Sequence, residues 1–387
     1  MHNDRKKNQE RVEIQIMRVA ILTLFATGNM GALLQAFATQ KLVKQAGHES
    51  DLIYFRDEFL ENPINLKNLK RKGIRGYIGS IVGAILRMPC KKNMWAFIRK
   101  HVNITSHVNR REMENMVSQY DFFLAGSDCI WNSDAMAFEK SYLLDFVPTH
   151  KKGNYASSFA TNVIKKEYRA EYAKYLSQFQ SLSVREDQGK KIIYDLTGKE
   201  STVVLDPTLT LASSFWKKIS SESKLDLHEP YIFIAEYAVS PHLIREAKKL
   251  AEITGLPLYL LYPAKGGRLK GRLFISAGPE DFLALIQNAS FVLTDSYHVS
   301  IFSINFGIPF WTYLTETNLP TISKYDTVFG KLGLMCRIRK DATQVFDLLS
   351  QEKINYDTVY EKLEQERVVS KRFLQNILDQ REKVKNK

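Results

Sequence analysis

The chain has 387 residues, of which 44% are hydrophobic and 25% are charged, so it can bury the cores of two globular domains and is not a disordered protein. Its formal net charge is +13, but twelve Lys or Arg and a single acid lie between residues 66 and 112. Because one segment carries nearly the whole excess, the charge does not indicate a surface that coats nucleic acid. The three cysteines have no CxxC spacing and the eight histidines no HxxxH or HxH pairing, so we predict neither a disulfide framework nor a metal site.

The beginning of the chain has a β-α-β pattern. Residues 17–25, "MRVAILTLF", are a near-continuous apolar strand of the kind buried on both faces of a parallel sheet. A helix with apolar residues at helical spacing follows and stops at Gly47, and 48–55 is a second strand. Acidic residues precede the first apolar run, which continues directly into a turn, so no secretion signal is predicted. No apolar run approaches the ~18 residues of a spanning helix.

Two sets of alternating strands and helices divide the chain. Further strands are expected within 120–132, 152–160, 179–187 and 201–211, and the Ser- and Lys-rich stretch 212–230 is expected to be a linker. A second set runs from "YIFIAEYA" to "IPFWTYL" and is followed by a charged helical stretch from about Asn355. The predicted fold class is therefore α/β, with two Rossmann-like domains facing a cleft and a C-terminal helical segment. The expected boundaries are 17–211, with a basic insertion near 66–112, then 225–350 and 351–387.

Polar clusters follow five of the expected strands, after Phe25, Leu124, Tyr155, Val184 and Leu293. In open parallel sheets, ligands bind at the carboxyl ends of the strands. The coincidence of five such clusters predicts one shared ligand site.

Four of these clusters lie in the first domain, and three of them offer backbone N–H groups, hydroxyls or a carboxylate. "TGNMGA" (27–32) opens a helix, so Asn29 and Gly31 are candidates for holding an anion at its N-terminus, although turn chemistry also explains the glycines. "GSDCIWN" (126–132) places the hydroxyl of Ser127 and the carboxylate of Asp128 after a strand, where either residue could instead cap the next helix. Ser157 follows Tyr155, in the strand expected within 152–160, and is a further substrate-binding candidate.

Arg185 and His298 are the candidates with the strongest electrostatic character. Arg185, in "SVRED", ends a strand among apolar residues, and a buried guanidinium needs an anion, either a neighbouring acid or a bound phosphate or carboxylate. His298 lies in the first turn of a short helix that Asp295 or Ser296 could cap, a place that favours anions. A lone histidine is also often a satisfied core residue, and that alternative stays open.

The basic segment 66–112 admits three interpretations. A solvated charged surface is the simplest, and the apolar stretches "YIGSIVGAIL" and "MWAFI" also suit an amphipathic element on an anionic membrane. Single-stranded nucleic acid is disfavoured because the segment contains few aromatic residues, so no nucleic-acid partner is predicted.

Several stretches together resemble the bacterial polysaccharide pyruvyl transferase family. They are, in order, "TGNMGALLQAFATQKLVKQAGHE", "FLAGSDCIWN", "YASSFA", "SLSVREDQG", "VLDPTLTL" and "GPEDFLALIQNASFVLTDSYHVSIFSINFGIPF". The resemblance covers roughly residues 17–311. It implies a glycosyltransferase-B-like fold and a transfer of a pyruvyl group from phosphoenolpyruvate to two hydroxyls of a sugar, which form a cyclic ketal.

The resemblance also implies roles for individual residues. His298 and Arg185 match the family's catalytic and donor-binding candidates. The implied reaction needs a base for a sugar hydroxyl, and the carboxylate of Asp128 is our candidate. Ser296 stands two residues before His298, where some members carry an arginine; Lys265 or Arg268 is a candidate replacement. Phosphoenolpyruvate is expected as donor substrate, with no cofactor and no metal.

The expected acceptor is a sugar unit of a cell-surface polysaccharide or of its lipid-linked precursor. The expected location is the cytoplasm, with peripheral contact to the inner face of an anionic membrane as an open question. Two other functions remain: a nucleotide-sugar-dependent glycosyltransferase of the same fold, and a non-catalytic carbohydrate-binding relative.

Overall fold

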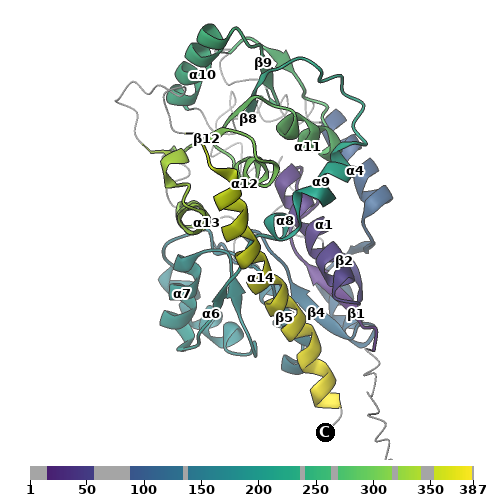
Figure 1. Cartoon of the computed structure of the whole chain (residues 1–387). Helices are drawn as coiled ribbons and strands as arrows, with labels where there is room; N and C mark the ends of the chain where they lie inside the picture. Colours follow the sequence, from purple (N-terminus) through teal and green to yellow (C-terminus); the bar gives the residue numbers. More distant parts are fainter. Residues whose placement is uncertain are drawn as a thin grey trace, which may run out of the picture.

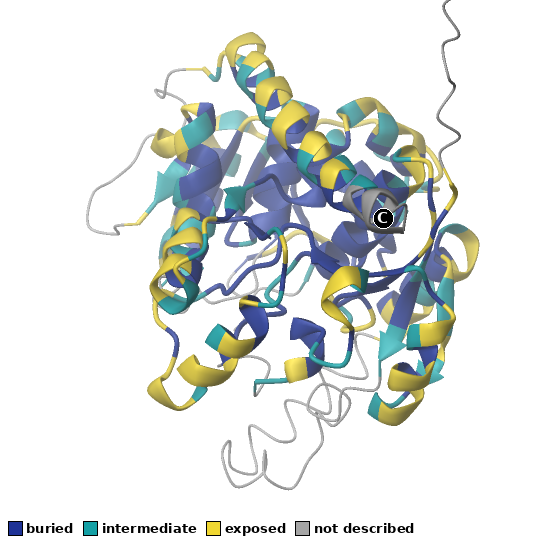
Figure 2. Ribbon diagram, turned by 90° about the horizontal axis from the view of Figure 1, so that it is seen from below, coloured by how far each residue is buried: buried dark blue, intermediate teal, exposed yellow. Residues whose placement is uncertain are grey.

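The computed structural model describes residues 15–55, 88–133, 138–235, 240–262, 269–315, 321–340 and 353–385. Within these residues the chain forms two parallel β-sheets, one in each half of the sequence, with helices packed around both (Figure 1). The buried residues gather in the strands and on the inner faces of the helices (Figure 2). The predicted α/β class with two Rossmann-like domains is confirmed.

The first sheet has five described strands in the order β3-β2-β1-β4-β5, all parallel. They are β1 (Arg18–Leu22), β2 (Glu49–Phe55), β3 (Ile104–Val108), β4 (Phe122–Ala125) and β5 (Lys152–Asn154). A short parallel pair, β6 (Ser183–Val184) and β7 (Thr202–Val203), continues this sheet through single bridges from Asp128 to Ser157 and from Ser157 to Val184.

The second sheet has six described parallel strands in the order β10-β9-β8-β11-β12-β13. They are β8 (Ile232–Ala235), β9 (Leu258–Leu260), β10 (Arg272–Leu273), β11 (Phe291–Thr294), β12 (Phe310–Tyr313) and β13 (Ile338–Arg339). Strand order reverses between β1 and β4 in the first sheet and between β8 and β11 in the second. Such reversal points are where open α/β sheets bind ligands.

The helices that matter for the site connect or cover these strands. They are α1 (Met30–Gln45), α4 (Met88–His101), α5 (Arg110–Asn115), α6 (Arg169–Leu176), α7 (Asp187–Thr197), α8 (Pro207–Thr210), α9 (Ser213–Ser220), α10 (Pro241–Thr254), α11 (Pro279–Gln287), α12 (Tyr297–Phe306), α13 (Ser323–Leu332) and α14 (Tyr356–Lys385). All ten residues of α12 are buried. A helix that is buried on all sides belongs to the core, and α12 contacts both β11 and α8, where the two domains meet.

The expected linker is wrong in its first part, because residues 213–220 form α9. Trp216 and Ile219 are buried on one face of this helix while Lys217 and Lys218 are exposed on the other. The polar composition of the segment concealed this amphipathic spacing. Helix α9 packs against α11, so the connection between the domains is itself part of their contact.

The expected basic insertion is also corrected where it is described. Residues 88–112 form α4, β3 and the start of α5, and β3 pairs with β2 at the edge of the first sheet. Their lysines and arginines are exposed on the outer surface of a regular Rossmann unit, except for the half-buried Arg110. Residues 66–87 of that expectation lie outside the described residues.

Helix α14 returns from the second domain and runs along the first (Figure 1). Its Arg367 donates from Nε to the carbonyl of Leu209 at 2.8 Å and from Nη2 to Asn305 Oδ1 at 2.9 Å. Ser370 Oγ accepts from the backbone N–H of Leu205 at 2.9 Å. The C-terminal helical segment is therefore a strap that holds both domains.

Candidate active site

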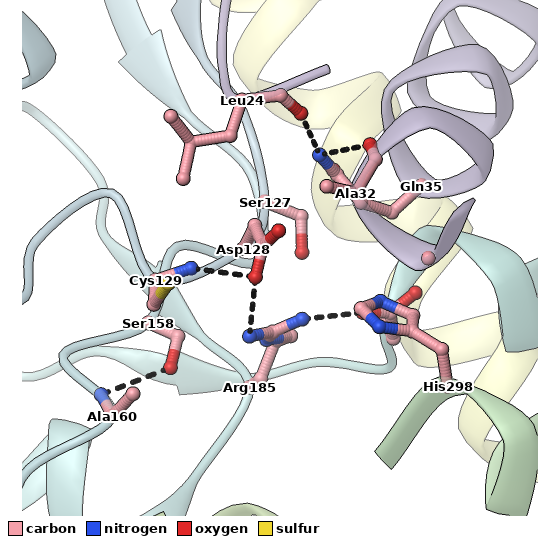
Figure 3. A network of polar contacts seen from close by, with 12 residues as sticks. Leu24, Ala32, Gln35, Ser127, Asp128, Cys129, Ser158, Ala160, Arg185 and His298 are labelled. Atoms are coloured by element: carbon pink, nitrogen blue, oxygen red, sulfur yellow. Dashed lines mark hydrogen bonds and ion pairs between the residues drawn. The ribbon is translucent and has the colours of Figure 1, made fainter. Parts of the chain in front are cut away.

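A buried ion cluster joins the two domains at the carboxyl ends of their strands. Arg185, directly after β6, is 3% exposed, and its Nη1 lies 2.6 Å from Oδ2 of Asp206. His298, in the first turn of α12, brings its Nε2 to 3.6 Å from the same oxygen. Asp206 thus links a cation of the first domain to the imidazole of the second (Figure 3 shows Arg185 and His298).

The charge state of Asp206 follows from these neighbours. Burial would raise its pKa, but His298, Arg185 and the backbone N–H of Thr208 together hold the pKa of this carboxyl well below its usual range. Its other oxygen, Oδ1, accepts from the N–H and the hydroxyl of Thr208 at 2.9 and 2.7 Å as the N-cap of α8. Asp206 is therefore an ionised carboxylate with both oxygens engaged, which suits a positioning role.

Arg185 has further contacts that fix its plane. Nη2 lies 3.5 Å from Oδ1 of Asp128, and the guanidinium carbon lies 5.3 Å from the centre of the Tyr297 ring. Among the described residues its buried Nε has no hydrogen-bond partner, and the same holds for Nε2 of His298 and Oγ of Ser127. Buried polar atoms normally find partners, so these three atoms at the strand ends are candidates for contacts with a polar ligand.

The loops that carry these residues have unusual backbone conformations. Asp128, Ala156 and Ala160 have φ values of 74°, 55° and 46°, although none is glycine. Glu186 holds the loop that contains Ala156 and Ala160, because its Oε1 accepts from Ser158 Oγ and from the N–H of Phe159, both at 2.9 Å. Non-glycine residues with a left-handed backbone conformation cluster at functional sites, where the surrounding packing holds them in that strained conformation.

Hydrogen bonds tie the loops after β1 and β4 to α1. Gln35, on α1, donates from Nε2 to Thr23 Oγ1 at 3.1 Å and to the carbonyl of Leu24 at 2.9 Å (Figure 3). Thr23 in turn donates to the carbonyl of Ser127 at 2.6 Å. The backbone that presents Ser127 and Asp128 is therefore held by the same helix whose N-terminus faces His298.

Helices α1 and α12 meet at their first turns. A Cβ added to Gly31 would overlap Nδ1 and Cγ of His298, so only glycine fits there. Asn29 caps α1, because its Oδ1 accepts from the N–H of Gly31 at 2.9 Å and of Ala32 at 3.3 Å. These two N–H groups of the predicted anion site thus already donate to Asn29. The backbone of Gly31 packs directly against the imidazole ring of His298.

The structure adds Lys324, which sequence reasoning missed. It lies in the first turn of α13, and its Nζ is 5.3 Å from the ring centres of both Tyr297 and Tyr325. Burial lowers its pKa, and the nearby Arg185 lowers it further while Asp128 acts in the opposite direction. No motif marks this lysine in the sequence, because it enters the site only through the packing of α13.

The remaining predicted residues have mostly scaffold contacts. Ser157 donates from Oγ to the carbonyl of Gly126 and accepts from Asn154, both at 3.0 Å. Ser296 caps α12, and the carbonyl of Asp295 accepts from the Tyr325 hydroxyl at 3.1 Å. Lys265 and Arg268 lie outside the described residues. All the predicted site residues stay predictions, and those within the described residues now have a place in the fold.

Comparison with known proteins identifies the family. A family model described as polysaccharide pyruvyl transferase matches residues 29–316, well over half of the chain. The chain belongs to the polysaccharide pyruvyl transferase family. It is therefore a transferase, and the family implies a sugar or polysaccharide acceptor. No curated protein matches the sequence.

One solved structure supports the fold of this pyruvyl transferase family member, and two others resemble it more distantly. UDP-N-acetylglucosamine 2-epimerase from Rickettsia bellii has a TM-score of 0.52 at 12% identity, over 96% of this chain and 98% of that one. The Neisseria meningitidis UDP-GlcNAc 2-epimerase bound to UDP-GlcNAc has a TM-score of 0.42 at 9% identity, over 91% of each chain. E. coli heptosyltransferase WaaC with ADP gives 0.37 at 13% identity, over 79% and 90%. The predicted glycosyltransferase-B-like fold is confirmed. Within the described residues no helix combines the length and apolar character needed to span a membrane.

Proposed function

We propose that this protein transfers a pyruvyl group from phosphoenolpyruvate to two hydroxyls of a sugar in a cell-surface polysaccharide or its lipid-linked precursor. The family supports a sugar acceptor. The observation that supports this donor is the gathering of Arg185, Lys324 and His298 around the ring of Tyr297. Phosphoenolpyruvate carries a phosphate and a carboxylate, so its site needs at least two cationic anchors.

Lys324 supplies the positive charge that some family members supply with an arginine at the position of Ser296. Ser296 is occupied in capping α12 and offers no positive charge. Lys324 of α13 has its Nζ 5.3 Å from the ring centre of Tyr297, so a cation is available from a different element. We assign Arg185 and Lys324 to the two anionic groups of the donor.

The proposed reaction balances without an oxidant or reductant. One sugar hydroxyl adds to C2 of the donor while C3 gains a proton and becomes a methyl group. The C2–O bond to phosphate then breaks, and the phosphate leaves with its electron pair. A second hydroxyl attacks C2 and loses its proton, which closes the ketal. The transfer therefore needs a base for the hydroxyls and a proton donor for C3 or the leaving phosphate.

Asp128 and His298 are the residues proposed for these proton transfers. Asp128 is partly exposed and lies beside Arg185, so its carboxylate can accept a hydroxyl proton from an acceptor entering from solvent. Among the described residues His298 Nε2 makes no hydrogen bond, and it lies 3.6 Å from Oδ2 of Asp206. Asp206 itself is assigned to positioning, because both its oxygens are engaged.

We further propose that the reaction takes place in the cytoplasm, with peripheral contact to the anionic inner face of a membrane when the acceptor is lipid-linked. The support is the surface charge of the first domain, where Lys91, Lys92, Arg99 and Lys100 of α4 are all exposed. Co-sedimentation with anionic but not neutral vesicles tests this part separately from catalysis.

The decisive experiment is calorimetric titration of the purified protein with phosphoenolpyruvate, followed by phosphate-release assays with pyruvylatable sugars. Lys324→Met is expected to weaken donor binding on the order of tenfold or more, because it removes one charge-assisted contact of about 1.5–3 kcal/mol. The exposed Lys191→Met is the matched control and leaves binding unchanged.

Failure of phosphoenolpyruvate to bind the intact protein would overturn the proposal. Thermal stabilisation by UDP- or GDP-sugars instead would favour the nucleotide-sugar glycosyltransferase. Saturable sugar binding without turnover of any donor would favour the non-catalytic relative.

A further inference from the structure

Three metal-ligating side chains meet at a second junction of the two domains, formed by other residues than the ion cluster around Arg185. His101 is the last residue of α4, Glu222 follows α9, and Glu280 lies in the first turn of α11. One ligand atom from each lies within 4.8 Å of the other two. The three residues are far apart in the sequence, so the spacing of histidines and cysteines could not reveal the group.

The imidazole of His101 is held in place by aromatic packing. The centre of its ring lies 4.6 Å from that of Phe97 and 6.0 Å from that of Phe37. Its Nε2 lies 2.9 Å from Oε2 of Glu222. The ring nitrogen is therefore fixed toward the carboxylates, as a preorganised ligand requires.

The carboxylates at this junction outnumber the charges that compensate them. Glu222 also accepts from Lys100 Nζ at 2.7 Å, and the Lys100 side chain is 59% exposed. Glu280 is partly buried, and in the described part of the structure its side chain has neither an ion pair nor a hydrogen bond to another residue. Asp281 adds negative charge next to it, although that carboxylate is satisfied by Ser223 Oγ at 2.6 Å and the N–H of Gly278 at 3.1 Å. The geometry and the charge together favour a cation between Glu222 and Glu280.

We propose that His101, Glu222 and Glu280 form a Zn²⁺ site that clasps the two domains together. One imidazole nitrogen with two carboxylate oxygens suits Zn²⁺ better than the oxygen-seeking Mg²⁺ or Ca²⁺. At bond lengths of about 2.0–2.2 Å, tetrahedral ligand atoms lie about 3.3–3.6 Å apart, so small side-chain rotations of these residues complete three positions. Water takes the fourth position, and the exposed Lys100 moves away as the metal arrives.

The clasp would act on the arrangement of the domains and not on the transfer chemistry. Helix α4 belongs to the first domain, α11 belongs to the second, and Glu222 belongs to the connection between them. A metal bound to all three stabilises the folded state by a free energy that grows with the logarithm of the free metal concentration above the dissociation constant. The inference is independent of the donor and the acceptor.

The test is titration of Zn²⁺ into the full chain after dialysis against a chelator, followed by calorimetry and by thermal unfolding. We expect saturable binding of one ion and a higher unfolding temperature, with much weaker binding of Mg²⁺. His101→Gln and Glu280→Gln are each expected to weaken Zn²⁺ binding on the order of tenfold or more. The control is His228→Gln, at a histidine whose side chain is 93% exposed.

Lys100→Met separates the metal site from a simple ion-pair network. If the site binds Zn²⁺, removing the competing ammonium tightens metal binding, and the Zn²⁺-induced rise in unfolding temperature grows. If the group is only the network of Lys100, Glu222 and His101, the variant loses stability and gains no affinity for Zn²⁺. That result overturns the proposal, as does the absence of saturable Zn²⁺ binding or equal binding in His101→Gln and Glu280→Gln.

Discussion

Gly31 in the first turn of α1 lies against the imidazole of His298 in the first turn of α12, with no room for a side chain between them. The two residues belong to different domains, in the helices that follow β1 and β11. Their contact sets how closely the reversal points of the two sheets approach each other. The lack of a Cβ atom at Gly31 therefore allows the two helices to approach each other closely at the site.

Gly31→Ala is expected to displace His298 and reduce transfer activity strongly. The added methyl group overlaps the ring, and overpacking of this kind costs about 1–3 kcal/mol of stability. Gly330→Ala is the matched control, since a Cβ at that helical glycine in α13 meets no atom within 4 Å. Denaturant unfolding and activity assays of both variants check the prediction, which fails if Gly31→Ala retains wild-type turnover.

Asp206→Asn is expected to destabilise the protein by about 3–5 kcal/mol at neutral pH, because it leaves the buried guanidinium of Arg185 without its closest anion. The pKa of Asp206 is lowered in the folded state. Its contribution is therefore fully present above the unfolded pKa of about 3.9 and is lost as pH falls toward the lower folded value.

The measurement for Asp206 is urea unfolding of wild type and variant at several pH values. The difference in free energy of unfolding should stay constant above about pH 5 and shrink below about pH 4. Asp326→Asn, at an exposed pair with Lys340, is the control and should change stability little. A constant difference down to the lowest pH at which both proteins fold would contradict the assignment.

Arg367→Met is expected to weaken the hold of α14 on the segment that carries Asp206. The guanidinium donates to the carbonyl of Leu209 and to Asn305, and its loss leaves buried acceptors unsatisfied at about 1–3 kcal/mol each. Since Arg367 touches no proposed substrate group, kcat should fall more than donor affinity. Arg372→Met, at an exposed residue of the same helix, should leave both unchanged.

Lys152→Met tests a buried lysine of the first sheet. Burial lowers the pKa of Lys152 to about 8, and its Nζ donates to Gln178 Oε1 at 2.7 Å. The unfolded chain binds this proton up to about pH 10.4, so the stability of the wild type rises relative to the variant between about pH 8 and pH 10. Unfolding at these two pH values measures the change, and the exposed Lys191→Met should show none.

The alternation of strands and helices could be predicted because each element carries its own period and its own stop signal. The first strand and α1 follow directly from a continuous apolar run, a cap at Asn29 and Gly47 after the helix. Helix α9 was hidden because its few apolar residues lie among serines and lysines, and only contact with α11 makes their spacing meaningful.

The site could be predicted only where a residue follows a strand. Arg185, Asp128 and His298 all lie at such ends, and the resemblance to the family named the same residues. Asp206 precedes Pro207, and in the sequence it has the pattern of an ordinary helix cap. Its second oxygen contacts Arg185 and His298 only in the folded chain. Lys324 was missed for the same reason, because tertiary packing alone brings α13 to Tyr297.

The strap formed by α14 has a consequence for the order in which the protein matures on the ribosome. The N–H of Leu205 and the carbonyls of Leu209 and Leu211 belong to the first domain, yet their partners Ser370 and Arg367 are synthesised after both domains. Until those residues emerge, the segment around Asp206 has unpaired backbone groups and Arg185 lacks a rigid counter-ion. Nascent chains released before residue 370 should therefore contain both sheets without the assembled ion cluster of Arg185, Asp206 and His298.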